Sequence, residues 1–223
     1  MSKAAAFFDI DGTLLDSTIV HFYAHLSTAE MSPRRRAWWT IRFAPWIPVL
    51  MAVDMFSRAA FNRMFYRFYK GMEAERLFHL MEETAESFAL PKMFPEAKET
   101  FERHASQGHE TALVTGTAEM IAAPLGRLLG ASGVMAVQLE VSEGRFTGEL
   151  TTPPLSGKAK AEAARAFASE RGIDLSASYA YGDSMADAEL LRLAGHPTAV
   201  NPSRGLLSLA RREGWPVKRW TKG

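Results

Sequence analysis

The sequence AAAFFDIDGT, residues 4–13, places two aspartates at the end of a short apolar run. The apolar residues 4–8 predict a buried strand, which gains no stability from carboxylates at its end. Like charges that lie close together raise one another's pKa unless a cation lies between them. Because side chains alternate between faces in extended backbone, Asp9 and Asp11 can point to one side while Ile10 points to the other. This stretch therefore predicts a strand that carries two cooperating carboxylates to a functional site.

Gly12 follows the two aspartates and allows the chain to turn tightly, which brings backbone N–H groups near an anion. In this geometry Asp9 can attack phosphorus, and Asp11 can protonate the departing oxygen and later take a proton from water. An ordinary Asp-Gly turn after a strand is the alternative for this motif taken alone.

Strand-like and helical patterns alternate along most of the chain. Helical patterns cover residues 117–130 and 157–172, and the second of these ends at Gly172. This alternation predicts an α/β fold with a mostly parallel sheet flanked by helices, in which ligands bind beyond the carboxyl ends of the strands. The predicted strands are residues 4–8, 111–114, 178–181 and 197–200.

The segment between the first two predicted strands is too long for a simple crossover, which needs only one helix. It has no strand-like alternation, and it is rich in Phe, Met, Arg and Glu. We predict an inserted helical cap at residues 17–92 and a catalytic core made of residues 1–16 and 93–223. The stretch VQLEVSEGRFTGEL, residues 137–150, predicts a β-hairpin. The helices expected in the cap are residues 17–29, 33–56, 58–71 and 73–89.

Composition narrows the class of protein. With 223 residues and 47% hydrophobic content, the chain can bury a sizeable core. The 26 basic and 25 acidic residues give a net charge of +1, so we expect no nucleic-acid partner. The chain has no cysteine, which excludes disulfides and thiolate sites and suits a cytoplasmic protein. Its first residues lack the long apolar core of a signal peptide, so we do not expect secretion.

Two further carboxylates follow the third predicted strand in YGDSMADAELL, residues 181–191. Asp183 lies at the strand end, and Asp187 lies one helical turn later. Carboxylate oxygens at a strand end suit Mg²⁺, which binds one or two carboxylates together with water and phosphate oxygens. An aspartate before a helix is often only an N-cap, and this is the alternative for Asp183 taken alone.

Groups able to hold phosphate follow two other segments. The stretch LVTGT, residues 113–117, supplies the Thr115 hydroxyl and Gly116 N–H at a strand end. Lys158 follows the flexible PPLSG stretch and opens a predicted helix, where a cation is unfavourable unless an anion lies nearby. A solvated surface lysine is the alternative for Lys158.

Taken in this order, the motifs resemble those of the haloacid dehalogenase superfamily. DIDGT looks like its first motif, VTGT its second, Lys158 its third and GDSMAD its fourth. The chain is most similar to the subfamily IB hydrolases, relatives of phosphoserine phosphatase, because of its length, the position of its cap, its hairpin and its VNP stretch. The resemblance implies a Rossmann-like core, an inserted helical C1 cap and Mg²⁺-dependent hydrolysis of phosphomonoesters through an aspartyl-phosphate.

The resemblance also implies a role for each acidic residue of the first and fourth motifs. Asp9 is the nucleophile and a metal ligand, Asp11 is the acid/base and offers its backbone carbonyl to Mg²⁺, and Asp183 completes the protein ligands. Asp11 favours a phosphatase, because dehalogenases lack an acid/base aspartate there and transport ATPases carry threonine.

The remaining motif residues are assigned to the phosphate. Thr115 and Lys158 hold the phosphoryl oxygens, together with Gly12 and Gly116. Lys158 also keeps the nucleophile ionised and neutralises charge on the transferring group. Asp187 orients Lys158 or a metal-bound water.

The sequence does not identify the substrate. Phosphoserine phosphatases carry a glutamate nine positions after the nucleophile, where this chain has Thr18, and they usually have serine in place of Gly12. Thr18 and His21 are candidate pocket residues near the start of the cap. His21 and His25 lie at helical i, i+4 spacing, which is compatible with a metal pair, although a structural role is favoured because no third ligand accompanies them.

The stretch RRRAWWTIRFAPWIPVLMAVDMF, residues 34–56, has arginines beside tryptophans, as at membrane interfaces. We favour an aromatic cap core with a solvated basic edge, and a membrane surface is the alternative. The expected function is hydrolysis of small or amphiphilic phosphomonoesters. The alternatives are a phosphotransferase using the same intermediate, a lipid-phosphate phosphatase at the membrane surface, and a phosphate-binding protein without turnover.

Overall fold

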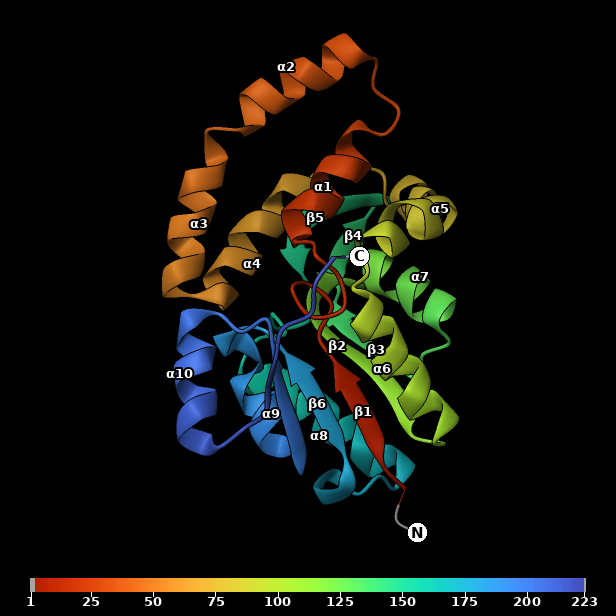
Figure 1. Ribbon diagram of the computed structural model, residues 1–223. Helices are drawn as coiled ribbons and strands as arrows, with labels where there is room; N and C mark the ends of the chain where they lie inside the picture. The colour runs from red at the N-terminus through yellow and green to blue at the C-terminus, as the bar shows by residue number, and fades with distance from the viewer. Residues whose placement is uncertain (1–2, 223) are drawn as a thin grey trace.

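A six-stranded parallel sheet lies at the centre of the computed structural model, which describes residues 3–222 (Figure 1). The strand order is β3-β2-β1-β6-β7-β8, and each neighbouring pair is parallel. The α/β fold class predicted from the sequence is confirmed, and two edge strands, β3 and β8, are additional. The strands are β1 (Ala5–Phe8), β2 (Glu110–Ala118), β3 (Gly133–Val137), β6 (Tyr179–Gly182), β7 (His196–Val200) and β8 (Val217–Lys218).

Strand β1 is apolar along its whole length because helices cover both faces of the sheet. On one face, Ala6 and Phe8 pack with Phe101. On the other face, Ala5 and Phe7 belong to a second core cluster. The first face is covered by α6 (Pro95–Ser106) and α7 (Glu119–Leu129), and the second by α8 (Lys158–Arg171), α9 (Ala188–Leu193) and α10 (Arg204–Glu213).

Of the six α-helices between β1 and β2, the first five lie beyond the carboxyl end of the sheet, and the sixth, α6, covers one of its faces (Figure 1). The single helix predicted for residues 33–56 is instead two, because the chain turns at Ala44 and Pro45 and Pro45 precedes the second helix. Short 3-10 or π turns follow α4 and α5. The helices are α1 (Ile19–Thr28), α2 (Pro33–Phe43), α3 (Trp46–Phe56), α4 (Arg58–Tyr66) and α5 (Ala74–Thr84).

The predicted hairpin is present as β4 (Leu139–Ser142) and β5 (Arg145–Leu150). It hydrogen-bonds to the chain between α4 and α5, where Gly71 N–H donates to the Phe146 carbonyl at 2.8 Å and Phe146 N–H donates to Met72 at 2.9 Å. The hairpin therefore joins the helical layer over the sheet. The division into a core and a cap at residues 17 and 92 stays a prediction.

A buried histidine next to the central sheet makes stability depend on pH. His104, on α6, has its Nε2 2.8 Å from the Tyr181 hydroxyl and its Nδ1 2.8 Å from Nδ1 of His109. Burial, with the charge of His109 as the next cause, lowers the pKa of His104 to about 4. In the unfolded chain a histidine has a pKa of about 6.5. Between these two values only the unfolded chain binds the proton of this histidine, so the contribution of His104 to the free energy of unfolding falls as pH falls from about 6.5 to about 4.

Urea unfolding at about pH 7.5 and about pH 5.5 measures this dependence. We expect the wild type to lose more stability than the variant His104→Gln over this interval, because glutamine does not titrate. Equal losses in the two proteins would show that another group is responsible.

Candidate active site

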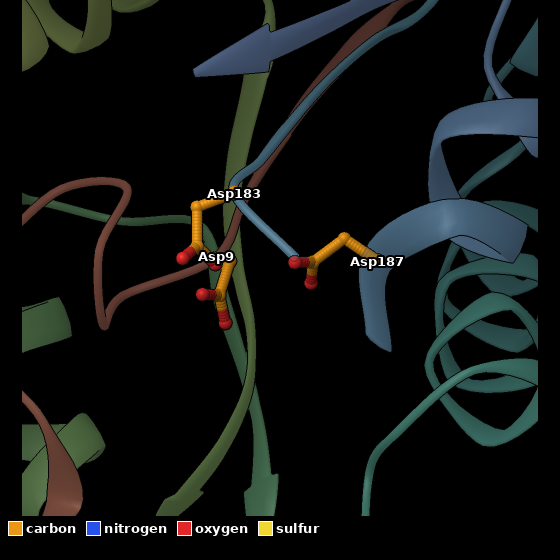
Figure 2. A group of neighbouring side chains, drawn as sticks. All are labelled: Asp9, Asp183 and Asp187. Atoms are coloured by element: carbon orange, nitrogen blue, oxygen red, sulfur yellow. The ribbon is translucent and has the colours of Figure 1, made fainter. Parts of the chain in front are cut away.

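Three aspartates converge at the carboxyl end of the sheet (Figure 2). Asp9 follows β1 and Asp183 follows the adjacent strand β6, so the parallel pairing brings them together. Asp187 lies buried just before α9. One carboxylate oxygen from each residue lies within 4.8 Å of the others. The expectation that carboxylates from distant parts of the chain meet at this edge is thus met.

The lysine of the site is Lys160, and the prediction of Lys158 is corrected. The Nζ atom of Lys160 lies 2.6 Å from Oδ1 of Asp9 and 2.5 Å from Oδ1 of Asp187. Lys160 is only 3% exposed, whereas Lys158 is exposed at the first residue of α8. Residues two apart lie about 200° apart around a helix axis, so the two lysines cannot share a face.

A pattern in α8 distinguishes the two lysines. Lys160, Ala164 and Ala168 are spaced by four residues and are all buried. This spacing identifies the face that packs on the sheet. Lys160 therefore carries the only ammonium group on that small-residue face of α8.

The carboxylates have different electrostatic environments. Burial raises the pKa of Asp9 to about 7, and Asp187 adds to the rise while Lys160 opposes it. Burial and the charges of Asp187 and Asp9 raise the pKa of Asp183 well above its ordinary value. Burial would raise the pKa of Asp187 as well, but Lys160 and Ser184 hold it below its ordinary value. Asp187 thus keeps its charge and positions Lys160.

The donor set fits a divalent cation such as Mg²⁺. Within the cluster, three carboxylates face one ammonium group, so a cation would relieve the excess negative charge. Gly12 is essential to this packing, because its φ is +81° and an added Cβ would lie 2.4 Å from Oδ2 of Asp183. The close approach of Asp183 to the backbone at Gly12 places its carboxylate beside Asp9.

Asp11 is held by two hydroxyl groups that the sequence analysis missed. Ser17 donates to Oδ1 at 2.7 Å, and Thr117 donates to Oδ2 at 2.6 Å. Hydroxyl groups can donate or accept, so the same two residues can hold Asp11 as a carboxylate or as an acid. A serine and a threonine at these positions carry no sequence pattern that separates them from turn residues.

Thr115 and Gly116 lie within β2, which extends to Ala118 rather than ending at residue 114. The pairing with β3 shifts register between Val114 and Ala118, so the backbone here leaves the regular ladder. Thr115 is buried, and its hydroxyl accepts the Thr117 N–H at 3.1 Å. The predicted phosphate-binding loop is therefore a distorted strand end that borders the pocket.

The helical layer completes a small pocket of about 40 Å³ above the carboxylates. Tyr66 donates to the Gly116 carbonyl at 2.7 Å, which fixes α4 against β2. Arg58 and Asn62, also on α4, line the pocket and were not predicted. The lining is Asp9, Asp11, Ile19, Arg58, Asn62, Thr115, Gly116, Thr117, Leu155, Lys160, Asp183, Ser184 and Ala186.

Thr18 and His21 do not line this pocket, which corrects their prediction as substrate-contacting residues. Both are exposed, and His21 Nδ1 accepts the Thr18 N–H at 3.1 Å to cap α1. His25 stacks on Phe88 and bonds to Thr84, as expected for a structural histidine. Ile19 is the residue of this segment that borders the pocket.

The Thr117 contact predicts a measurable effect on rate. Thr117→Val removes the hydroxyl that orients Asp11, so we expect kcat for an aryl phosphate to fall by about tenfold while KM changes little. The matched control is Thr198→Val, at a buried position on β7. An unchanged kcat for Thr117→Val would show that this hydroxyl does not support the predicted acid/base role of Asp11.

Three comparisons place this geometry among known proteins. A profile described as haloacid dehalogenase-like hydrolase matches residues 6–192. A phosphoserine phosphatase of Mycobacterium tuberculosis is 33% identical over 216 residues, covering 96% of this chain and 70% of the relative. A histidinol-phosphatase of Neisseria meningitidis is 30% identical over 237 residues, covering 96% of this chain and 98% of the relative.

A solved structure supports the same fold. A phosphoserine phosphatase with a phospho-aspartyl intermediate analogue aligns with a TM-score of 0.70 at 20% identity, covering 98% of this chain and 94% of that chain. The profile match spans most of the chain, and relatives that are 33% and 30% identical to it are named phosphatases. The protein therefore belongs to the haloacid dehalogenase-like hydrolases and is a phosphatase of that family.

Proposed function

We propose that this protein is a Mg²⁺-dependent phosphomonoester hydrolase that forms an aspartyl-phosphate at Asp9. The observation that carries the proposal is the convergence of the buried Asp9 and the half-buried Asp183 with the ammonium group of the buried Lys160. A buried carboxylate that has a cation on one oxygen is an oriented nucleophile.

In the first step, Oδ2 of Asp9 forms a bond to phosphorus and the bond from phosphorus to the ester oxygen breaks. Asp11 gives its proton to the departing oxygen, so the product leaves as a neutral alcohol. Lys160 already engages Oδ1 of Asp9 at 2.6 Å, which leaves the other oxygen free for attack.

In the second step, Asp11 takes a proton from water as the water oxygen attacks phosphorus. The bond between phosphorus and Asp9 breaks, which releases phosphate and regenerates the carboxylate. Ser17 and Thr117 hold Asp11 through both steps because their hydroxyls can donate or accept.

The cation would be held by the carboxylates of Asp9 and Asp183 and by the backbone carbonyl of Asp11. When bound, Mg²⁺ supplies charge neutralisation for the phosphoryl oxygens. The Thr115 hydroxyl, the Gly116 N–H and the Lys160 ammonium group would hold the same oxygens. Asp187 keeps Lys160 in place through their 2.5 Å contact.

The substrate would be a small or amphiphilic phosphomonoester bound beneath α4, in the pocket that Arg58 and Asn62 line. The named relatives act on phosphoserine and histidinol phosphate, which are both phosphomonoesters of alcohols. Thr18 in place of a glutamate, and its exposure, disfavour phosphoserine itself. A cytoplasmic location stays a prediction from the cysteine-free composition.

Metal removal tests the proposal. After treatment with EDTA, we expect hydrolysis of an aryl phosphate to fall by at least about 10³-fold and to return when Mg²⁺ is added. Full activity in excess EDTA would contradict the proposed metal dependence. Product analysis with added alcohols separates hydrolysis from phosphotransfer, because only phosphotransfer yields a new phosphate ester.

A further inference from the structure

The helices α2 and α3 expose an unusual number of large apolar side chains. Trp38 is 71% exposed, Met55 is 82% exposed and Phe56 is 88% exposed. In Figure 1, α2 lies at the end of the molecule farthest from the sheet, and α3 runs from there back toward the start of α4. Large contiguous apolar surfaces on a soluble domain mark interaction sites. We define the α2–α3 surface by its exposed apolar side chains: Trp38, Ile41, Trp46, Ile47, Val49, Met51, Met55 and Phe56.

The inner sides of the same helices already fill the helical layer. Trp39 and Phe43 stack with a centroid distance of 5.0 Å, and Phe43 packs against Tyr23 and Phe68. Leu50 of α3 is 2% exposed. The favoured prediction, an aromatic cap core in residues 34–56, thus describes Trp39, Phe43 and Leu50 but not the exposed side chains of the same helices. The side chains of the α2–α3 surface are exposed, and among them Trp46 also contacts the helical layer, with its ring centroid 5.4 Å from that of Phe68.

Charge around the α2–α3 surface is strongly positive. Residues 33–56 contain four arginines and one aspartate. The aspartate, Asp54, is paired with Arg58 at 3.0 Å, so its charge is offset. Arg34 and Arg42 lie on the same side of α2 as Trp38, one turn before and one turn after it. An apolar surface bordered by arginine and tryptophan is complementary to the interface of an anionic bilayer.

The shape of the segment fits a helix pair that lies on a membrane. The helices α2 and α3 have 11 residues each, and no helix within residues 3–222 is long and apolar enough to cross a bilayer. A second copy of the chain is a poorer occupant, because a symmetric contact would bring the two sets of arginines together.

The α2–α3 surface is connected directly to the active site. Phe56 is followed by Ser57, whose hydroxyl accepts the Ala60 N–H at 3.2 Å and caps α4. The first residue of α4 is Arg58, which lines the pocket above the carboxylates. Phe56, the most exposed residue of the α2–α3 surface, therefore lies two positions before the pocket residue Arg58.

We propose that the α2–α3 surface binds the anionic face of a lipid bilayer and that the substrate is a phosphomonoester carried by that bilayer. The substrate part of this proposal rests on the phosphatase function proposed above, and the binding part does not. Insertion of Met55 and Phe56 among the lipids brings Arg58 to the level of the headgroup phosphates.

Vesicle co-sedimentation tests the binding part. The probe is phosphatidylcholine vesicles with or without about 30% phosphatidylglycerol, whose phosphodiester is not a substrate for a monoesterase. We expect the protein to pellet with the anionic vesicles, and high salt to weaken the binding. Failure to pellet with anionic vesicles would overturn the proposal.

Two paired variants locate the contact. Met55→Ser with Phe56→Ser removes apolar contact, and Arg34→Glu with Arg42→Glu reverses charge. Each pair is expected to weaken partitioning into the anionic vesicles by at least about tenfold. The matched controls are Val141→Ser, at an exposed apolar residue of β4, and Arg211→Glu with Arg212→Glu, at two exposed arginines of α10. Because all these side chains are exposed, thermal unfolding should change little. An equal loss of vesicle binding in the control variants would overturn the assignment of the α2–α3 surface as the membrane contact.

Activity on two substrates tests the substrate part. Met55→Ser with Phe56→Ser is expected to lower hydrolysis of vesicle-bound phosphatidate by about tenfold and to leave hydrolysis of a soluble aryl phosphate unchanged. Asp9→Asn should abolish both activities and still pellet with vesicles, so failure of the catalytic proposal is distinguishable from failure of binding. Sedimentation velocity is the last check, because a dimer that the same variants dissociate would identify a second copy as the occupant and overturn the proposal.

Discussion

Asp9→Asn is expected to lower kcat for an aryl phosphate by at least about 10⁴-fold, because an amide oxygen cannot form the acyl phosphate. Asparagine has nearly the same size and keeps the hydrogen bond to Lys160, so the pocket should keep its shape. Steady-state kinetics with Mg²⁺ present measures the effect. Acid quenching during turnover should detect covalent phosphate in the wild type and none in the variant.

The matched control is Asp16→Asn, in the same N-terminal segment. Asp16 pairs with Lys222 at the surface and does not line the pocket. It should therefore keep wild-type kcat. If Asp9→Asn retained substantial turnover, the assignment of the nucleophile would be wrong.

Lys160→Met is expected to have the second largest effect, a fall in kcat/KM of about 10³-fold. The substitution removes the cation that contacts both Asp9 and Asp187. It also leaves buried carboxylates without their partner, which costs about 3–5 kcal/mol of stability. Unfolding measurements on the variant with and without Mg²⁺ separate the loss of activity from the loss of stability. Bound Mg²⁺ should restore part of the stability of the variant but not its activity.

Lys158→Met is the control for Lys160→Met. Lys158 is exposed at the start of the same helix, so its removal should leave both kcat/KM and stability unchanged. Lys160→Arg keeps the charge and should retain more stability than methionine. A large fall in kcat/KM with Lys158→Met and none with Lys160→Met would show that Lys158 is the lysine of the site, as the sequence motif predicted.

The aspartates of the site could be predicted because topology determines where they meet. Asp9 and Asp183 follow apolar runs, and the carboxyl ends of neighbouring parallel strands lie at one edge of a sheet. Lys160 was missed because Lys158 and Lys160 are two residues apart, so the choice depends on the rotation of α8. The alanines at 164 and 168 carry that information.

Other features of the site depend on tertiary contacts that have no local pattern. Ser17 and Thr117 reach Asp11 from separate segments, 100 residues apart in the chain by their numbers. Arg58 and Asn62 enter the pocket only because α4 docks on β2 through Tyr66. The exposed side of α3 was equally unpredictable, because a helix that is apolar all round usually lies in a core.

The edge strands show a similar limit. Strand β3, Gly133–Val137, is only partly buried along most of its length, and β8 has two residues. Strand β3 has an apolar run at residues 134–137, but this run leads directly into the predicted hairpin, and β8 is too short to show a pattern. Their pairing depends on the strands already in place.

The most direct test of the central claim is a crystal structure grown with Mg²⁺ and beryllium fluoride, which mimics a phosphoryl group on aspartate. We predict a fluoride adduct on Asp9, Mg²⁺ bound by Asp9, Asp183 and the Asp11 carbonyl, and Lys160 in contact with the adduct. An adduct on another residue, or a cation bound away from Asp9 and Asp183, would contradict the account.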